Sequence, residues 1–317
     1  MRILYYTVAD QDVNTMSNSI KSDYMSDLLF HGMRSLFGVN VVDYPKKKHM
    51  YKSWLGNTSE LWGRGFTYAK TLDDINLPRG WQPSDFDVII YSVHHTIHQN
   101  PAKLYEMLSS INHPKKVVID GHDLTSGYDF ALNYTPHVFK REIVDDNSKF
   151  IPISFGIPKE KVVCNPGFKT QPIATIVPAD HTHPNRKTHV FETESDYYNE
   201  YRKSYFGITV KKGGWDCERH YEILGNGCIP IFGDIENCPK NTLTHLPKEL
   251  LKEIKNLPFL RLPNKVFDKN NIDLNHKYVD DHIDVETCSH IIKDLLGYTK
   301  QYLTTESIAR YVLEKVV

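Results

Sequence analysis

The stretch KGGWDCERHYEILGNGCIPIF, residues 212–232, carries the strongest structural signal in this chain of 317 residues. It joins a pair of glycines to a helical pattern, a Gly-Asn-Gly break and a short apolar strand. Gly213 and Gly214 let the backbone approach an anion without an intervening side chain. The free N–H groups and the positive dipole end of a following helix favour negative charge at the same place. This order of elements predicts a phosphate site at a helix N-terminus.

The predicted helix, from Trp215 to Leu224, has two different faces because successive residues turn by about 100°. The apolar face, which we expect to be buried, consists of Cys217, Tyr221 and Leu224. The polar face, which we expect to look into a cleft, consists of Trp215, Glu218, Arg219 and Glu222. An arginine can make paired hydrogen bonds to phosphate, and a carboxylate can accept hydrogen bonds from ribose hydroxyls. The alternative interpretation is an ordinary helix–turn–strand unit with a solvated charged face.

The end of this helix and the strand after it follow from glycine and from the apolar residues. Gly225 stands where a helix C-cap favours a residue with positive φ. Residues 228–232, CIPIF, predict a short buried strand that ends at Gly233.

The same segment resembles the donor-binding segment of exostosin-like glycosyltransferases, in which Arg-x-x-Glu is followed by small residues, Gly-Cys-x-Pro and an apolar strand. The matching residues are Arg219, Glu222, Gly227, Cys228 and Pro230. More loosely, the C-terminal half resembles the second Rossmann-like domain of two-domain, GT-B-type glycosyltransferases. Residues 22–45 resemble the opening of uncharacterised glycosyltransferase-like proteins from bacteria and phages.

The resemblance implies a transferase that uses a nucleotide sugar, linked to UDP or GDP, as a co-substrate and needs no other cofactor. The residues expected to bind the nucleotide are Lys212, Gly213, Gly214, Trp215, Arg219 and Glu222. The acceptor is expected to be a glycan, a lipid-linked glycan, or a hydroxymethylated pyrimidine in DNA of the phage type. Two alternatives stay open: a sugar-nucleotide epimerase and a non-catalytic module that binds sugars or polymers.

Composition limits where the chain works and what it binds. The formal net charge of −1 argues against broad electrostatic binding to nucleic acid or to an anionic membrane. The opening MRILYYTVAD predicts a strand rather than a signal peptide, and no run approaches the roughly 18 apolar residues of a membrane helix. The five cysteines contain no C-x-x-C pair, which favours reduced thiols in the cytoplasm and no zinc site. Animal exostosins are membrane-anchored, so the chain departs from that family here.

Alternating strands and helices predict an α/β fold of two Rossmann-like domains facing across a cleft, the GT-B type. We expect an N-terminal acceptor domain at 1–165 and a C-terminal donor domain at 170–317. Strands are expected at 2–8, 39–42, 87–92, 116–120, 150–155, 172–177, 206–210 and 228–232. Helices are expected at 22–37, 101–110, 195–205, 248–256, 286–296 and 304–317. The resemblance implies that the last helix crosses back to the first domain.

The candidates for catalysis follow the predicted strands of the first domain, because ligands collect at the carboxyl ends of open α/β sheets. They are Asp10, His94, His95, Asp120, His122 and Asp123. A transferase that inverts the anomeric centre needs a general base, for which histidine and carboxylate groups are suited. The run from Asp120 to Asp123 is the first choice, because a carboxylate beside an imidazole orients it. A retaining transferase would need no such base, and the sequence does not decide between the two.

Metal binding is not expected, although two Asp-x-Asp triplets are present. Asp85 and Asp87 precede their strand, and Asp10 and Asp12 follow the first strand directly, an unusual place for such a motif. The histidine- and lysine-rich runs 46–51 and 181–189 could contact a phosphate-bearing acceptor, although solvated loops are the simpler interpretation.

Overall fold

The computed structural model describes residues 1–13, 15–75, 80–176, 191–263, 272–273 and 276–317. Six strands of the first half form one parallel sheet in the order β2-β1-β3-β4-β5-β6. They are β1 (Ile3–Val8), β2 (Val41–Tyr44), β3 (Val88–Val93), β4 (Lys116–Asp120), β5 (Val138–Lys140) and β6 (Ile151–Pro152). The chain reverses its direction of travel across the sheet between β1 and β3. Such a switch point is where sheets of this kind bind ligands.

The helices of the first half are α1 (Asn18–Lys21), α2 (Tyr24–Phe37) and α3 (Ala102–Ser110). The helix α2 begins after Asp23, whose side chain accepts a hydrogen bond from the N–H of Ser26, and it ends at Gly38, where φ is 52°. Asparagine, aspartate and serine are the residues that cap helices in this way, and glycine tolerates the positive φ. Every residue of β3 and β4 is buried, as expected for strands covered on both faces.

A second parallel sheet has the order β7-β8-β9 among the described residues. Its strands are β7 (Gln171–Ile173), β8 (Ser204–Thr209) and β9 (Ile229–Phe232). The helices of this half are α4 (Glu194–Arg202), α5 (Glu218–Gly225), α6 (Lys248–Ile254), α7 (Val285–Tyr302) and α8 (Thr305–Glu314). The chain is therefore α/β with two parallel sheets.

Two details of residues 212–232 differ from the sequence prediction. The helix α5 begins at Glu218, three residues after the predicted start at Trp215, because the N–H groups before it bond to a side chain from the first half. The positive φ lies at Gly227, where it is 63°, and not at Gly225. Gly225 is needed for packing instead, since a Cβ there would lie 2.7 Å from Cδ1 of Ile157.

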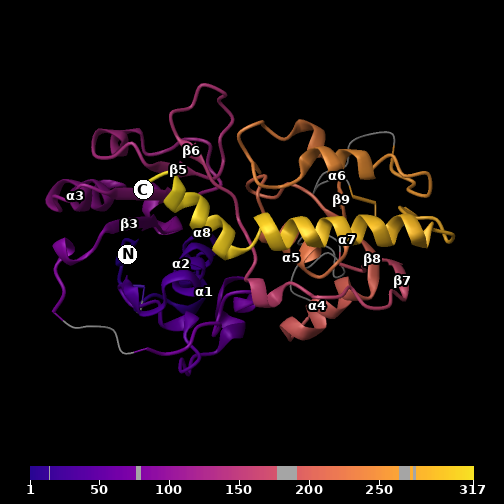
Figure 1. The fold of residues 1–317 in the computed structure, drawn as a ribbon, viewed down its shortest axis with the longest axis horizontal. Coiled ribbons are helices and arrows are strands. Elements are labelled where there is room, and N and C mark those ends of the chain that lie inside the picture. Colours follow the sequence, from indigo (N-terminus) through magenta and orange to yellow (C-terminus); the bar gives the residue numbers. More distant parts are fainter. Residues whose placement is uncertain (14, 76–79, 177–190, 264–271, 274–275) are drawn as a thin grey trace.

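The end of the chain ties the two halves together (Figure 1). The helix α7 runs towards the first half, the chain bends after it, and α8 packs on α2. Gly32 of α2 allows this close approach, because a Cβ there would overlap the backbone carbonyl of Thr305. One cluster of buried apolar side chains includes residues of both sheets. The two halves therefore share one hydrophobic core.

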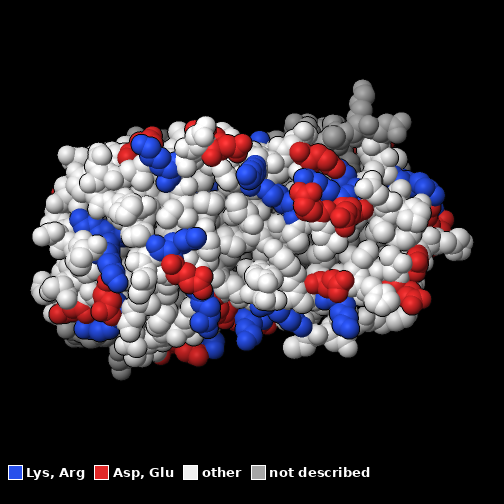
Figure 2. Space-filling model, turned by 45° about the horizontal axis from the view of Figure 1, so that its top comes forward, with Lys and Arg blue, Asp and Glu red and all other residues white. Residues whose placement is uncertain are grey.

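The surface carries both signs of charge. On the face shown in Figure 2, lysine and arginine side chains are interspersed with aspartate and glutamate, in keeping with the net charge of −1. Within the part of the chain that the structure describes, none of the helices has both the length and the apolar character needed to cross a bilayer.

Candidate functional site

The two glycines that open residues 212–232 lie against carboxylates of the first half. A Cβ on Gly213 would overlap Oδ2 of Asp123, and one on Gly214 would overlap Oε1 of Glu142. Glu142 accepts hydrogen bonds from the N–H groups of Trp215 and Asp216, both at 3.0 Å. The close approach of an anion to these glycines is therefore present. The anion is a carboxylate of the chain, so these two N–H groups do not face an open phosphate site as the sequence predicted.

Arg141 completes this contact between the halves. Its guanidinium pairs with Asp123 and with Oε1 of Glu142, the latter at 2.9 Å, and its Nε donates to the carbonyl of Gly121 at 2.9 Å. It also donates to the carbonyl of Asp216. We call Asp123, Arg141, Glu142 and the two glycines the clasp. Each donor group of Arg141 finds a carboxylate or a carbonyl. Arg141 and Glu142 therefore form a satisfied buried ion pair, while the side chain of Asp123 is 58% exposed.

The polar face of α5 is buried, which corrects the expectation that it looks into an open cleft. Trp215, Glu218, Arg219 and Glu222 are each less than a tenth exposed. Thr67 and Tyr68 of the long loop before β3, together with tyrosines of α4, cover this face. The sequence could not show this cover, because the loop lies some 150 positions away along the chain and has no regular period.

Arg219 stands out within this buried face. Its side chain is 3% exposed, and none of its three guanidinium nitrogens has a hydrogen-bond partner among the described residues. The phenol of Tyr197 lies close enough to interact with the guanidinium, without the geometry of a full hydrogen bond, and Tyr201 and Glu222 are its other electrostatic neighbours. A buried guanidinium without hydrogen bonds is costly, so its position favours a missing anionic partner.

Glu222, one turn further along α5, is held by two hydroxyl groups. Thr67 donates its Oγ1 hydrogen to Oε1 at 2.7 Å, and the hydroxyl of Tyr197 donates to Oε2 at 2.6 Å. Burial raises the pKa of Glu222, while these two hydrogen bonds act in the opposite direction. Thr67 has a φ of 76°, which is unusual for a β-branched residue. The carboxylate thus accepts hydrogen bonds from two hydroxyl groups of the protein, and its role towards ribose hydroxyls stays a prediction.

Lys212 adds a second cation beside Arg219. Burial, and then the charge of Arg219, lower the pKa of Lys212 to about 8. Burial, and then the charge of Glu222, raise the pKa of Glu218 well above its usual value, which favours the neutral form of this carboxyl group. Two neighbouring cations in a poorly solvated place repel each other, and an anion bound between them would relieve that repulsion.

The catalytic candidates of the first half lie at the carboxyl edge of its sheet. In the sheet register Val93 pairs with Val8 on one side and with Asp120 on the other. The N–H of His94 donates to the carbonyl of Val8 at 2.8 Å. Asp10 follows β1, the two adjacent histidines follow β3, and residues 120–123 follow β4, as the order of the strands predicts.

Asp120 and His122 form a buried network. The Nδ1 atom of His122 lies 3.0 Å from Oδ1 of Asp120, and Nζ of Lys140 lies 3.0 Å from Oδ2. Burial alone would lower the pKa of His122, but the hydrogen bond and the charge of Asp120 raise it above its usual value. Tyr128 also approaches Nδ1, at 3.2 Å. Only 8% of the His122 side chain is exposed. Asp123, the last residue of this run, belongs to the clasp and pairs with Arg141.

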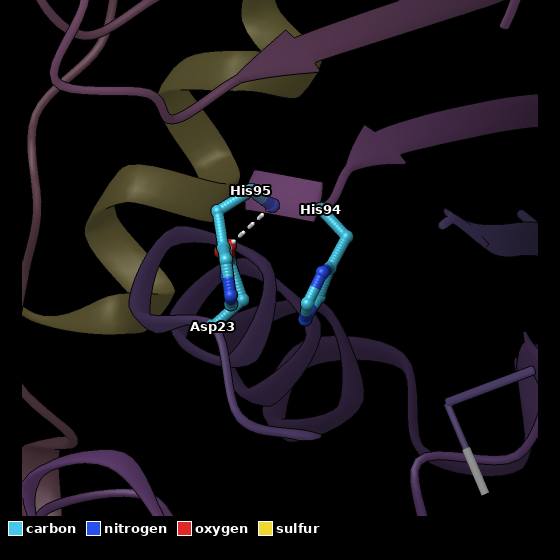
Figure 3. Close-up of side chains that lie close together, drawn as sticks. All are labelled: Asp23, His94 and His95. Atoms are coloured by element: carbon cyan, nitrogen blue, oxygen red, sulfur yellow. Dashed lines mark hydrogen bonds and ion pairs between the residues drawn. The ribbon is translucent and has the colours of Figure 1, made fainter. Parts of the chain in front are cut away.

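A second pairing of histidine and aspartate lies at the switch point (Figure 3). Oδ2 of Asp23 accepts hydrogen bonds from the backbone N–H and from Nδ1 of His95, both at 3.1 Å. The ring of His94 lies beside that of His95, with ring centroids 4.1 Å apart. Sequence reasoning found both histidines but missed Asp23. It fell inside the predicted helix 22–37, and its partner lies 72 positions further along the chain.

These three residues are also a possible metal-binding group, since one donor atom from each lies within 4.8 Å of the others. Both oxygens of Asp23, however, already accept hydrogen bonds, Oδ1 from Ser26 and Oδ2 from His95. The hydrogen-bonded arrangement explains the contacts without an ion. The absence of a metal requirement stays a prediction.

The remaining candidates have simpler positions. The backbone N–H of Asp10 lies 3.5 Å from Oγ1 of Thr96. Asp85 lies in a short turn, Pro83–Asp85, before β3, and Asp87 accepts a hydrogen bond from the N–H of Arg2. This second Asp-x-Asp triplet is thus at the amino edge of the sheet, as predicted. The histidine-rich run 181–189 falls outside the described residues.

A scan against protein-family models finds no match, and a search of curated proteins finds no significant match. Among solved structures, the chain is similar to an alpha-glucosyltransferase in complex with UDP and a 13-mer DNA containing a central A:G mismatch. The sequence identity is 12% and the TM-score is 0.42, over 100% of this chain and 96% of that chain. A likeness at this level carries no argument about fold or activity.

Proposed function

We propose that the chain is a glycosyltransferase that moves a sugar from a nucleotide-sugar donor to a hydroxyl acceptor. Residues 1–165 would form the acceptor domain and residues 170–317 the donor domain, in the GT-B arrangement. The observation that carries the proposal is Arg219, a fully buried guanidinium without a hydrogen-bond partner among the described residues. It supports a site for an anion that is bound during function.

The diphosphate of the donor is the anion that we assign to this place. Lys212 and Arg219 would share its charge, with Gly213, Gly214 and Trp215 forming the adjoining backbone. Arg219 can bind two phosphate oxygens at once. Because two cations already face the site, the donor is proposed to bind without a metal ion.

Glu222 is assigned to the ribose of the donor. Its two oxygens accept hydrogen bonds from Thr67 and Tyr197, and two ribose hydroxyls could replace these donors one for one. The hollow near α2, lined in part by Tyr24, Trp62 and Tyr68, comprises no more than about 200 Å³ of space, part of which is open solvent. Sites for molecules of drug size usually hold about 300–1,000 Å³. Donor binding is therefore proposed to displace the loop that carries Thr67.

The acceptor would approach the carboxyl edge of the first sheet, where Asp10, His94, His95, Asp120 and His122 lie. We propose a glycan, a lipid-linked glycan or a hydroxymethylated pyrimidine in DNA, and a cytoplasmic location. A gel-shift at low salt with plain and hydroxymethylated duplex separates the DNA acceptor from the others, because phosphate contacts make DNA binding steeply dependent on salt.

The test of the donor site is isothermal titration of the chain and of Arg219→Met with UDP and GDP. Wild type is expected to bind one of them. Loss of a hydrogen-bonded charge pair should weaken that binding by about 1.5–3 kcal/mol, which is roughly a 10- to 150-fold rise in Kd. Glu222→Ala should weaken it by about 1–3 kcal/mol.

The matched control is Lys293→Met, a lysine-to-methionine change in the solvent-facing part of α7, which should leave nucleotide affinity unaltered. Unchanged affinity in Arg219→Met, or no binding of either nucleotide by wild type, would remove the donor site and the proposal with it. Mass spectrometry of reactions with a panel of nucleotide sugars and acceptors would then identify the transferred sugar. An epimerase would instead release an altered nucleotide sugar without any acceptor.

A further inference from the structure

We propose that His95 is the general base of the transfer reaction and that Asp23 is its positioning residue. This inference rests on the proposed function and names the group that activates the acceptor hydroxyl. It differs from the first choice made on the sequence, the pair Asp120 and His122, and it adds Asp23, which sequence reasoning missed.

Access to solvent separates the two pairs. The side chain of His95 is 44% exposed, whereas that of His122 is 8% exposed. A general base must come within hydrogen-bond reach of the proton that it removes. Asp120 is in addition already bonded to Lys140, so the buried pair belongs to a closed ion network. His95, which is paired with Asp23, is therefore the histidine that an acceptor can reach.

Asp23 fixes which nitrogen of His95 is basic. Its Oδ2 atom can only accept, so the contact at 3.1 Å places the proton of the neutral imidazole on Nδ1. The lone pair then lies on Nε2, at the other end of the ring. Asp23 is itself held by the N–H of Ser26 at the start of α2, and the N–H of His95 fixes the backbone beside it. The orientation therefore rests on backbone contacts from both elements.

His94 supports the ring without competing for the proton. Burial lowers the pKa of His94 to about 4, so its ring is neutral near pH 7. It packs against the ring of His95 at an interplanar angle of 34° (Figure 3). A neutral neighbour adds no positive charge that would oppose protonation of His95 during the reaction.

The position in the fold brings this pair towards the donor site. His95 follows β3 at the switch point of the sheet. Tyr24, the residue after Asp23, lies close enough to the polar face of α5 that the charges of Glu222 and Glu218, after burial, raise its pKa. The start of α2 therefore lies between the histidine and the residues proposed to bind the nucleotide.

The step proceeds with inversion at the anomeric carbon. Nε2 of His95 takes the proton of the acceptor hydroxyl while the acceptor oxygen forms a bond to that carbon. The bond from the same carbon to the diphosphate oxygen breaks, and its electron pair leaves with the nucleoside diphosphate. The imidazolium of His95 then releases its proton to water.

The test uses Asp23→Asn in the full chain. Asparagine caps helices as well as aspartate does, so its oxygen keeps the contact with Ser26. Its amide nitrogen then replaces Oδ2, loses the contact with the backbone N–H of His95 and faces Nδ1 of the ring. The proton of His95 must then move to Nε2, which can no longer act as a base. We expect kcat to fall about 100-fold or more, the range of general base catalysis, while Kd for the nucleotide stays within twofold. His95→Gln should lower kcat as much. The control is His137→Gln, because His137 directly precedes β5 at the amino edge of the sheet, and this change should leave kcat unaltered.

Nitrogen-15 NMR of the histidine rings gives a readout that does not depend on activity. The wild type should show His95 protonated at Nδ1, and Asp23→Asn should show it protonated at Nε2. Wild-type His95 protonated at Nε2 would overturn the proposal even if no acceptor is found. It is equally overturned if the product keeps the anomeric configuration of the donor. Transfer that survives in His95→Gln but is lost in His122→Gln would also overturn it, while leaving the transferase function intact.

Discussion

Two buried arginines near residues 212–216 have opposite surroundings. Arg141 is bonded to Asp123, Glu142 and two backbone carbonyls, whereas Arg219 has no hydrogen-bond partner among the described residues. Removing one member of a satisfied buried network leaves the others uncompensated, but removing an unpaired charge relieves a cost. The two residues therefore separate a structural role from a functional one.

We predict opposite effects on stability for Arg141→Met and Arg219→Met. Arg141→Met should lower the free energy of unfolding by about 3–5 kcal/mol, because it leaves the carboxylates of the clasp unpaired. Arg219→Met should leave it unchanged or raise it, because a methionine fills the space without a charge. Urea denaturation measures both. If Arg219→Met proved as destabilising as Arg141→Met, Arg219 would be a structural residue.

The sequence identified Arg219 and Glu222 as neighbours on one face of a helix, because residues three apart in a helix lie on the same side. It could not show that this face is covered, since the covering residue Thr67 is distant along the chain. It also could not pair Asp23 with His95. Such pairings depend on tertiary contacts between segments that carry no shared local pattern.

The part of the loop before β3 that carries Thr67 covers the helix α5. Thr67 bonds to Glu222 and to the hydroxyl of Tyr198, at 2.7 and 2.8 Å, while Tyr68 donates to the carbonyl of Gly156 at 2.5 Å. These contacts compensate for the positive φ of Thr67. Around Thr67, the conformation of this loop is thus fixed by its contacts with α4 and α5.

Thr67→Val is predicted to lower the free energy of unfolding by about 1–3 kcal/mol, because the hydroxyl is lost and buried partners remain. Valine has the same β-branched shape, so the backbone cost at positive φ is unaltered. Thr67→Ser keeps the hydroxyl and should cost about 1 kcal/mol or less, for the lost methyl group. Chemical denaturation of the two variants compares them. Equal losses would mean that the hydroxyl contacts contribute nothing.

Two glycines give a second matched comparison. Gly214→Ala should destabilise the chain, because its Cβ would overlap Glu142 and lie 2.9 Å from Nη1 of Arg141. Gly297 lies inside α7 with nothing within 4 Å of an added Cβ. Gly297→Ala should therefore raise the free energy of unfolding by up to about 1 kcal/mol. Thermal unfolding distinguishes the two, and a neutral Gly214→Ala would contradict the close packing of the clasp.

Most helices and strands were predictable, because apolar periodicity and glycine or proline breaks are local signals. The strands β1, β3 and β4 and the helix α2 lie within two residues of their predicted bounds. The short strand β5 was missed, because three residues are too few for a pattern to stand out. The helix α5 began later than predicted, because Glu142 holds the N–H groups of the residues before it.

At the scale of the whole molecule, charged contacts and a shared core join the two halves. Glu142 of the first half accepts hydrogen bonds from the N–H groups of Trp215 and Asp216 in the second. The side chain of Asp216 in turn accepts a hydrogen bond from the N–H of Phe155 at 2.8 Å. The helix α8 adds an apolar contact by packing on α2. Any movement of one half against the other, such as one that admits a nucleotide, must change these contacts between the halves.

The contacts between the halves should depend on pH through Asp216. Burial raises the pKa of its carboxyl group to about 7, well above the ordinary value of about 3.9. The folded state therefore holds a proton that the unfolded state releases between about pH 4 and pH 7. The contribution of Asp216 to stability is present at low pH and is lost as pH rises through this window.

Asp216→Asn keeps an acceptor for the N–H of Phe155 but cannot ionise. The free energy of unfolding of this variant should therefore lack the pH-dependent contribution of Asp216. The free energy of unfolding of wild type minus that of the variant is expected to fall by on the order of 4 kcal/mol between pH 4 and pH 8. Urea denaturation at several pH values measures this difference, and taking the difference cancels the other carboxyl groups that titrate in the same range. A difference that stays constant with pH would show that Asp216 is ionised throughout, and that the two halves are held by a charge rather than by a neutral carboxyl group.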